Sequence, residues 1–491
     1  MNSRLINNKF FLAFIILAVS VFFGTAIPVI SLYNQKMLIE LFFTAILLIP
    51  TLFYCIKGSH RIIPAVFYVW ILAPFFRRIC DWLTGAYSDT SLIIVAPYVA
   101  CFILFVPLLG SKYRITKKQK YLMVSFLVVV GYGLLYGVLN NGTAALYQFL
   151  AYFAPVTILL YILIKNPSNE TRVKWINRLV SMAVLVSIYG WIQFLFVPPW
   201  DAFWMQSVEM NSIGRPLPLE VRMFSTLNAP GVTALFLGAV LVAQLSDNQF
   251  SGRWGILKVI IIISALAITL VRSAWIMVAI AFLASVFILS KKKKFKSLFL
   301  MATMGAFLFL VVPHLPGGDI IASRANSFQS LGQDTSFNAR ISFLQSTLQN
   351  AIASNPLGYG LGGTGVGTKL GSDGGGTSVF DNGYLDIIYT FGVVFGTFLI
   401  IVFFKIRGVI KESLVYDNSL KPFSRLAYLT LVCLFVSLLA GNSFTGIFGL
   451  VFWLFIGISL NDKKFEAINQ TELEDGKKPK GVKVGRKRIV W

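Results

Sequence analysis

Long apolar runs alternate with short polar connections along most of the chain. A transmembrane helix needs roughly 20 mostly apolar residues, and fourteen segments approach that length, although the third and the last two are short or closely spaced. They lie near residues 10–30, 37–56, 62–76, 91–109, 121–139, 143–164, 175–197, 229–245, 256–271, 273–290, 297–313, 384–404, 425–440 and 443–460. The pattern predicts an all-α polytopic transmembrane helix bundle of about 12–14 spans.

Composition supports a membrane protein and excludes several other classes. Hydrophobic residues make up 56% of the chain and charged residues only 13%, against about 25% charged residues in soluble domains. The four cysteines lie in or beside apolar runs without paired spacing, which argues against a disulfide framework or a zinc site. The net charge of +23 would suit nucleic acid only on one soluble face, but the basic residues lie between apolar segments, so we expect no nucleic-acid partner.

The distribution of lysine and arginine predicts the orientation. The segment near 10–30 follows Arg4 and Lys9 as a signal peptide would, but it is long and lacks a clear cleavage site, so we interpret it as the first span. With a cytoplasmic N-terminus, inner connections hold 31 of the 43 basic residues and outer connections hold nine. Because cytoplasmic loops are enriched in Lys and Arg, this asymmetry predicts an even number of spans with both termini cytoplasmic.

This topology divides the chain into four parts. Residues 1–313 form the first part of the bundle, 314–383 an extracytoplasmic loop, 384–460 the C-terminal spans, and 461–491 a basic cytoplasmic tail attracted to anionic membrane lipids. Within the loop, apolar residues at spacings of three and four predict an amphipathic helix over 336–354.

A glycine-rich stretch follows that helix. Ten glycines lie between Asn355 and Gly376, and Gly358, Gly360 and Gly363 spell G-x-G-x-x-G. A dinucleotide fingerprint must follow a strand and open a helix, whereas this stretch follows a predicted helix on the outer side. We therefore exclude nucleotide binding and expect a mobile outer loop, whose glycines permit tight turns or close approach of backbone to a ligand.

Four charged residues of the expected outer side are the main candidates for chemistry. Arg272 divides an apolar run of about 35 residues, Arg222 precedes the eighth span, Arg340 lies on the amphipathic helix, and Asp381 lies at the entry of the next span. Arginine stays charged and can grip phosphate oxygens with two hydrogen bonds, so this set suits an anionic ligand. Alternatively, Arg272 is a turn residue that reaches the interface, and Asp381 only caps a helix.

At these positions the sequence resembles the O-antigen ligase and O-unit polymerase superfamily. The stretch "NARISFLQSTLQNAIASNPLGYGLGG", followed by "FDNGYLDIIYTFGVVFG", is similar to its signature, in which an arginine precedes a helix, glycines close it and "HN.yl" opens the next span. Arg222 with "STLNAP" and Arg272 with "SAW" resemble two earlier arginine motifs of the family. The resemblance covers about residues 215–400.

The resemblance implies an inverting glycosyltransferase that needs neither metal nor cofactor. Such an enzyme transfers a glycan from undecaprenyl diphosphate to a saccharide acceptor on the outer side of the bacterial inner membrane. It implies that Arg222 and Arg272 hold the diphosphate and that Arg340 supports the same pocket; Arg215 is a further substrate-binding candidate.

Asp381 departs from the family pattern, because ligases have at this position a histidine that is thought to activate the acceptor hydroxyl. A carboxylate can fill that role, since it is ionised at neutral pH and can accept a proton. Asp373 and Asp386 are reserve candidates for the base.

Three alternatives remain open. The Asp at the histidine position favours a polymerase of exopolysaccharide or O-antigen repeat units, although no arginine has the glycine eleven residues on that some polymerases show. A ligase that transfers polymer to lipid A core or protein is the second alternative, and a glycolipid flippase or transporter is the third. A polysaccharide chain-length regulator or a flippase is an expected protein partner. The outer aromatics Trp200, Phe203 and Trp204 either stack on sugars or anchor the membrane interface.

Overall fold

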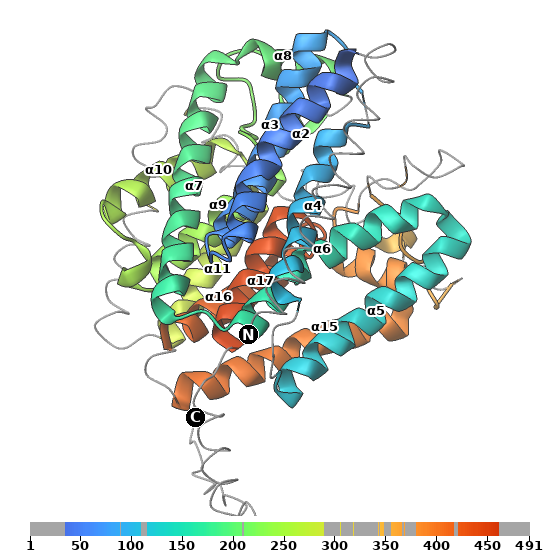
Figure 1. Ribbon diagram of the computed structural model, residues 1–491, viewed down its shortest axis with the longest axis vertical. Coiled ribbons are helices and arrows are strands. Elements are labelled where there is room, and N and C mark those ends of the chain that lie inside the picture. The colour runs from blue at the N-terminus through green and yellow to red at the C-terminus, as the bar shows by residue number, and fades with distance from the viewer. Residues whose placement is uncertain are drawn as a thin grey trace, which may run out of the picture.

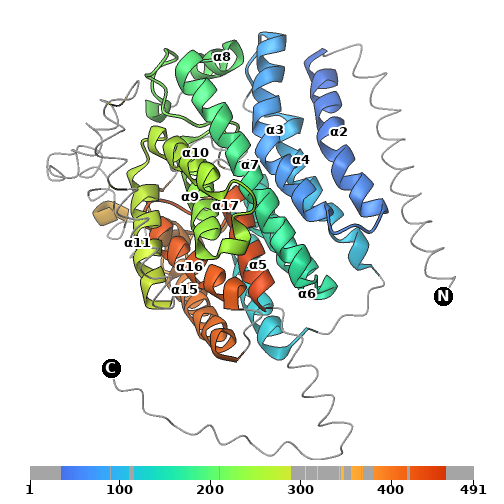
Figure 2. The ribbon, with the colours of Figure 1, turned by 90° about the vertical axis from the view of Figure 1, so that its left-hand side faces the viewer.

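The computed structural model describes residues 35–88, 90–109, 115–208, 211–288, 355–365, 380–416 and 421–460, with single residues at 305, 318, 342, 344–347 and 368. The expected span at 10–30, most of that at 297–313, most of the amphipathic helix at 336–354 and the basic tail lie outside this part of the chain. Figures 1 and 2 show a bundle of helices. Its main helices are α2 (Gln35–Ile56), α3 (Ile62–Thr84), α4 (Ala96–Ile103), α5 (Lys117–Asn141), α6 (Thr143–Lys165), α7 (Asn169–Phe196), α8 (Pro199–Ser207), α9 (Pro230–Ser246), α10 (Gly255–Ile268), α11 (Arg272–Ile288), α15 (Gly383–Tyr416), α16 (Lys421–Ser437) and α17 (Gly446–Leu460).

The described residues confirm an all-α membrane fold. Each of the twelve predicted spans that fall in this part of the chain corresponds to a helix, except that 91–109 is a series of three short helices around α4. Within the part of the chain that the structure describes, six helices are long and apolar enough to cross a membrane, namely α2, α3, α5, α6, α7 and the first 26 residues of α15. Between the described helices there are turns and isolated bridge residues, such as the pair Gly214 and Val221, but no strand. The short helix α8 was not predicted as an element.

Polar residues outside the apolar runs set where several helices begin. The Thr116 hydroxyl oxygen accepts a hydrogen bond from the backbone N–H of Gln119, and the Gln119 side-chain oxygen accepts one from the backbone N–H of Thr116, so that a capping box starts α5. Ser168 caps α7 by a single bond, since its hydroxyl oxygen accepts the backbone N–H of Thr171.

The helix α17 forms the centre of the bundle. Its residues from Ile447 to Leu460 are all buried, as expected for a helix that is apolar on every side. Trp453 is fully buried and packs edge-on against Phe126 of α5 at a ring distance of 5.0 Å. The surrounding contacts are to α3, α6, α9, α15 and α16.

Helix ends that are expected on the same side of the membrane do contact one another. Three contacts join ends expected on the cytoplasmic side: Gln119 to the carbonyl of Leu460, Arg425 to Asp247, and Trp175 to the carbonyl of His60. Three others join ends expected outside, with the backbone N–H groups of Leu219, Met223 and Gly383 donating to the carbonyls of Phe194, Ile268 and Leu438. We call the end of the bundle that holds the contacts of Leu219, Met223 and Gly383 the site face, and the opposite end the basic face. These contacts agree with consecutive spans that cross the membrane in alternating directions. The assignment of the site face to the outside of the cell remains a prediction.

The helix α15 is broken at Gly392, where φ is 73° and ψ is 171°. Residues 356–360 insert at the break. The N–H groups of Tyr359 and Gly360 donate to the carbonyls of Tyr389 and Thr390, and Val393 donates to the carbonyl of Pro356, all at 2.9 Å. In Figure 1, α15 runs beside α5, and the inserted segment packs between them.

The expectation of a mobile glycine-rich loop is therefore wrong for residues 355–365. A Cβ added to Gly360, whose φ is 76°, would lie 2.3 Å from the backbone nitrogen of Gly137 on α5. The N–H of Leu361 donates to the carbonyl of Gly133 at 2.8 Å. The close approach expected for these glycines is to the backbone of neighbouring helices, which the sequence alone could not distinguish from approach to a ligand.

We predict that Gly360→Ala destabilises the protein, whereas Gly408→Ala does not. The first change adds left-handed strain of roughly 1–2 kcal/mol and overpacking of roughly 1–3 kcal/mol, so the free energy of unfolding should fall by about 2–5 kcal/mol. Nothing lies within 4 Å of the Cβ position at Gly408, inside α15, and alanine favours a helix there. Thermal unfolding in detergent measures both variants; equal stability of the two would contradict the packed insertion.

Candidate functional site

The segment that contains Arg222 is fixed at the site face by backbone hydrogen bonds. Gly214 and Val221 form an antiparallel bridge, and the N–H of Arg222 donates to the carbonyl of Ile213 at 2.9 Å. The next residue, Met223, donates to the carbonyl of Ile268 at the end of α10. The segment therefore lies on the junction between α10 and α11.

The Arg222 side chain reaches the same junction. Its guanidinium donates to the carbonyl of Ser212 at 2.9 Å and to that of Leu270 at 3.4 Å. Leu270 has a φ of 57° and lies two residues before Arg272, the first residue of α11. The structure thus brings the segments of the two predicted arginines together.

This arrangement concentrates positive charge. Arg222 and Arg272 are both partly exposed, and the N-terminus of a helix is itself a positive end with N–H groups available to an anion. Two guanidinium groups beside the start of α11 give a location that suits a phosphate or diphosphate group.

Arg215 and Arg340 add less to this site. The Arg215 side chain is 80% exposed and lies 3.8 Å from the Glu220 carboxylate, and such exposed pairs contribute little energy. Its substrate-binding role stays a prediction. Arg340 lies outside the described residues.

Asp381 is exposed directly before α15. The side-chain oxygen of the next residue, Asn382, accepts hydrogen bonds from the N–H groups of Tyr384 at 3.0 Å and Leu385 at 3.2 Å. These are the bonds of an N-cap. The capping role that was the alternative for Asp381 therefore belongs to Asn382.

The reserve candidate Asp386 is buried instead of exposed. One carboxylate oxygen accepts a hydrogen bond from the Thr364 hydroxyl at 2.7 Å, and the other accepts one from the Asn442 amide, which also contacts the Tyr152 hydroxyl. Asp386 thus joins α15, the glycine-rich stretch that contains Thr364, and the connection between α16 and α17. This surrounding favours a structural role over that of a base in contact with solvent. Asp373 lies outside the described residues.

The short helical segment behind Asp381 is held from several sides. Gly383 N–H donates to the carbonyl of Leu438 at 2.7 Å, and the Tyr384 hydroxyl donates to the carbonyl of Phe435 at 2.8 Å. The ring of Tyr389 stacks on Tyr359 at 4.3 Å. Asp381 is therefore presented from a fixed support.

Helix α16 connects the two parts of the site, since it packs against both α11, which begins with Arg272, and α15, which follows Asp381. His60 does not belong to the site. It lies between α2 and α3 at the basic face, where burial and the charge of Lys165 lower its pKa.

Sequence reasoning missed several polar residues of the site face. Asn382 carried a detectable signal, because asparagine is a preferred capping residue before an apolar run. Arg78 in "FFRRICDWL" was a second signal, since charges inside apolar segments are costly. Asp201, which contacts Arg78, and Gln193, which contacts Asp201, had no distinguishing pattern.

These observations define a polytopic membrane protein with paired arginines and an exposed carboxylate at one end of its helix bundle. Residues 256–401 match the family model described as "O-Antigen ligase". The match supports the O-antigen ligase and polymerase superfamily, and with it a glycosyltransferase-type enzyme with a lipid-linked glycan and a saccharide acceptor as substrates. The matched range includes Arg272 and Asp381, but it begins after Arg222. No curated protein matches the chain.

We predict that Asn382→Ala lowers the stability of the protein by about 0.5–2 kcal/mol, the usual effect of losing an N-cap. Asp381→Ala should leave stability within about 0.5 kcal/mol, as surface changes away from special features do. Denaturant titration of the two purified variants measures the difference. A larger loss for Asp381→Ala would return the capping role to Asp381.

Proposed function

We propose that this protein transfers a glycan from an undecaprenyl-diphosphate donor to a saccharide acceptor at the outer face of the bacterial inner membrane. The reaction we favour is polymerisation of exopolysaccharide or O-antigen repeat units. The observation that carries the proposal is the hydrogen bond from Arg222 to the carbonyl of Leu270, which brings the Arg222 segment to the start of α11 at Arg272.

The two arginines supply what a diphosphate leaving group requires. Bond cleavage at the anomeric carbon places growing negative charge on the diphosphate, and preorganised donors at the position where charge develops are the largest single contribution in many enzymes. Arg222 and Arg272 can provide those donors without a metal. The energy of the reaction is stored in the lipid diphosphate bond, so no nucleotide is needed outside.

Asp381 supplies the second requirement. The acceptor hydroxyl attacks the anomeric carbon from the side opposite the diphosphate, so a new C–O bond forms while the bond to the diphosphate breaks and the configuration inverts. The hydroxyl proton passes to the Asp381 carboxylate. The exposed position of Asp381 beside a fixed helix segment supports this role.

The proposal of a polymerase over a ligase rests on Asp381 at the position where ligases of the family have histidine. The proposed location outside the cell rests on the 31 basic residues in the inner connections against nine in the outer ones. Ionisable groups of transporters usually lie near the membrane midplane, whereas Arg222, Arg272 and Asp381 belong to the ends of helices, which disfavours a flippase.

Gene deletion followed by complementation tests the proposal. Loss of long chains with accumulation of single-unit glycolipid is expected for a polymerase. Accumulation of lipid-linked polymer would indicate a ligase, and repeat units retained on the inner leaflet would indicate a flippase.

Arg272→Ala should fail to complement at matched membrane expression, because loss of one such donor lowers the transfer rate about 10²- to 10³-fold. Arg272→Lys should complement partly, since a point charge lacks the guanidinium fork.

We predict that Asp381→Asn lowers the transfer rate about 10²- to 10⁴-fold, the usual contribution of a general base. The amide keeps the size of the side chain, so binding of the acceptor should persist. Asp381→His should retain activity with a pH dependence displaced upward, toward the imidazole pKa of about 6.5. A purified assay with lipid-linked repeat units measures both. A wild-type rate in Asp381→Asn would mean that the base is another group.

A further inference from the structure

A buried ion pair lies behind the Arg222 segment. Arg78, near the end of α3, and Asp201, in α8, are both completely buried, and Arg78 Nε lies 2.7 Å from Asp201 Oδ1. The other two guanidinium nitrogens of Arg78 donate to the side-chain oxygen of Asn228 and the carbonyl of Ser225. All three contacts of Arg78 are thus made to the chain between α7 and α9.

The partner carboxylate extends the network to α7. The second oxygen of Asp201 accepts hydrogen bonds from the Tyr189 hydroxyl at 2.7 Å and from the Gln193 amide at 2.8 Å. The Gln193 side-chain oxygen in turn accepts the N–H groups of Phe224 at 3.0 Å and Ser225 at 2.8 Å. Gln193 therefore binds the N–H groups of the segment whose carbonyl Arg78 binds.

The segment gripped in this way has an unfavourable backbone conformation. Ser225 and Asn228 have φ values of 50° and 57°, although neither is glycine. Such conformations persist only where the surroundings over-determine them. The "STLNAP" stretch of residues 225–230 that follows Arg222 is held in place by these side chains.

Stability alone does not account for this pair. Removal of two charges from water offsets most of their attraction, so a buried ion pair is weak evidence for stabilisation. The pair instead fixes the positions of three groups relative to one another, because the Arg78 guanidinium donates to three acceptors in different directions. Arg78 also lies 5.1 Å from the Phe224 ring.

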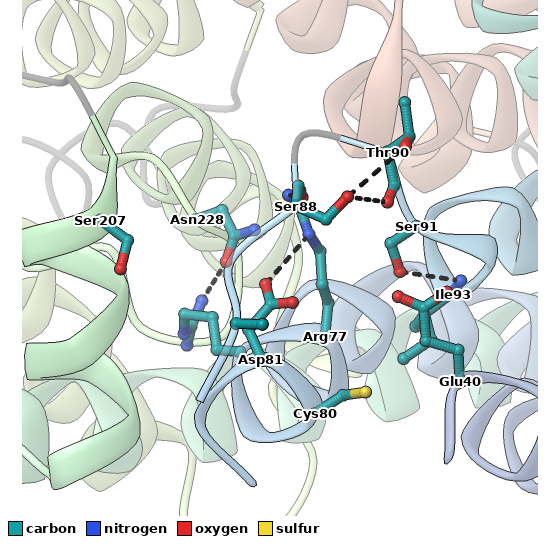
Figure 3. Close-up of polar contacts among 12 residues, drawn as sticks. Glu40, Arg77, Cys80, Asp81, Ser88, Thr90, Ser91, Ile93, Ser207 and Asn228 are labelled. Atoms are coloured by element: carbon teal, nitrogen blue, oxygen red, sulfur yellow. Dashed lines mark hydrogen bonds and ion pairs between the residues drawn. The ribbon is translucent and has the colours of Figure 1, made fainter. Parts of the chain in front are cut away.

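A neighbouring cluster on α3 fixes the helix end that presents Arg78. Figure 3 shows Arg77 and Asp81 together, and Asp81 also accepts a hydrogen bond from Lys36 of α2 at 2.6 Å. Arg77 lies 3.6 Å from Asp81 and donates to the carbonyl of Ser88. The end of α3 is therefore fixed to α2 on one side, while Arg78 holds the Arg222 segment on the other.

We infer that Arg78 is a positioning residue for Arg222, acting together with Asp201 and Gln193. This inference rests on the proposed function. Arg78 has no exposed surface, so we assign it no contact with the substrate. It fixes residues 224–228, and thereby the approach of Arg222 to Arg272, in the geometry that meets the diphosphate. A displacement of about 1 Å at a catalytic group can lower a rate about 10²-fold.

The test measures the effect of Arg78→Lys on kcat in a purified transfer assay. The substitution is made once in a protein that keeps Arg222 and once in a protein that carries Arg222→Lys. With the natural Arg222, kcat should fall about 10²-fold while KM for the acceptor is unchanged, because the acceptor binds elsewhere. In the Arg222→Lys background, Arg78→Lys should lower kcat less than about 3-fold, since groups that act as a unit are not additive.

Arg172→Lys is the matched control. Arg172 is also buried and donates to the carbonyls of Pro167 and Ile458, but at the basic face. This variant should lose stability as Arg78→Lys does, while its kcat per folded molecule stays within about 2-fold of wild type, as expected for a residue distant from the site.

Hydrogen exchange tests the inference without activity. Arg78→Lys should speed exchange of the N–H groups of Phe224 and Ser225, whereas Arg172→Lys should not. Equal kcat losses in both Arg222 backgrounds, or unchanged exchange at these two residues, would overturn the positioning role. Inactive wild-type protein would refute the proposed function, and the exchange result would still decide whether Arg78 holds the segment.

Discussion

The constraint on which the site depends is that backbone polar groups inside a membrane need partners within the protein. The break at Gly392 frees carbonyls and an N–H group of α15, and the inserted segment 356–360 binds them. That insertion is possible only because Gly360 has no side chain where α5 approaches it. The break ends the short helical segment that follows Asp381, so the segment can be fixed separately from the long remainder of α15. The packing of the glycine motif at the break therefore supports the helical segment that carries Asp381 at its start.

The same constraint applies to charge. The Asp386 carboxylate is buried and meets donors from Thr364 and Asn442, and the Arg78 guanidinium is buried and meets three acceptors. In each case an ionisable side chain inside the bundle binds an irregular connection at the site face. Asp386 holds the connections around α15, and Arg78 holds the one before α9. Buried ionisable groups therefore fix irregular connections at this end of the bundle.

Hydropathy predicted the helices of the described residues well, because the length of an apolar run and the bilayer thickness impose the same spacing. It did not predict α8, which is too short and too aromatic to differ from an interfacial loop. The arginine motifs marked Arg222 and Arg272 by resemblance, but their proximity arises from a bond to the carbonyl of Leu270, which has no sequence signature. Glycine spacing likewise indicated close approach, but the partner proved to be the α5 backbone, because a glycine pattern is the same for a ligand and for a helix.

The site combines contributions from both halves of the chain. The matched range 256–401 contains Arg272 and Asp381, whereas Arg222 lies in the connection before α9. The residues that hold its segment come from α3, α7 and α8. Helix α16, which lies beyond the matched range, packs against both α11 and α15 and so sets their separation. In the proposed reaction a diphosphate is bound while a hydroxyl is oriented, so the rate depends on the distance between the arginines and Asp381. The helices outside the matched range therefore contribute to the proposed reaction by positioning the arginines and Asp381.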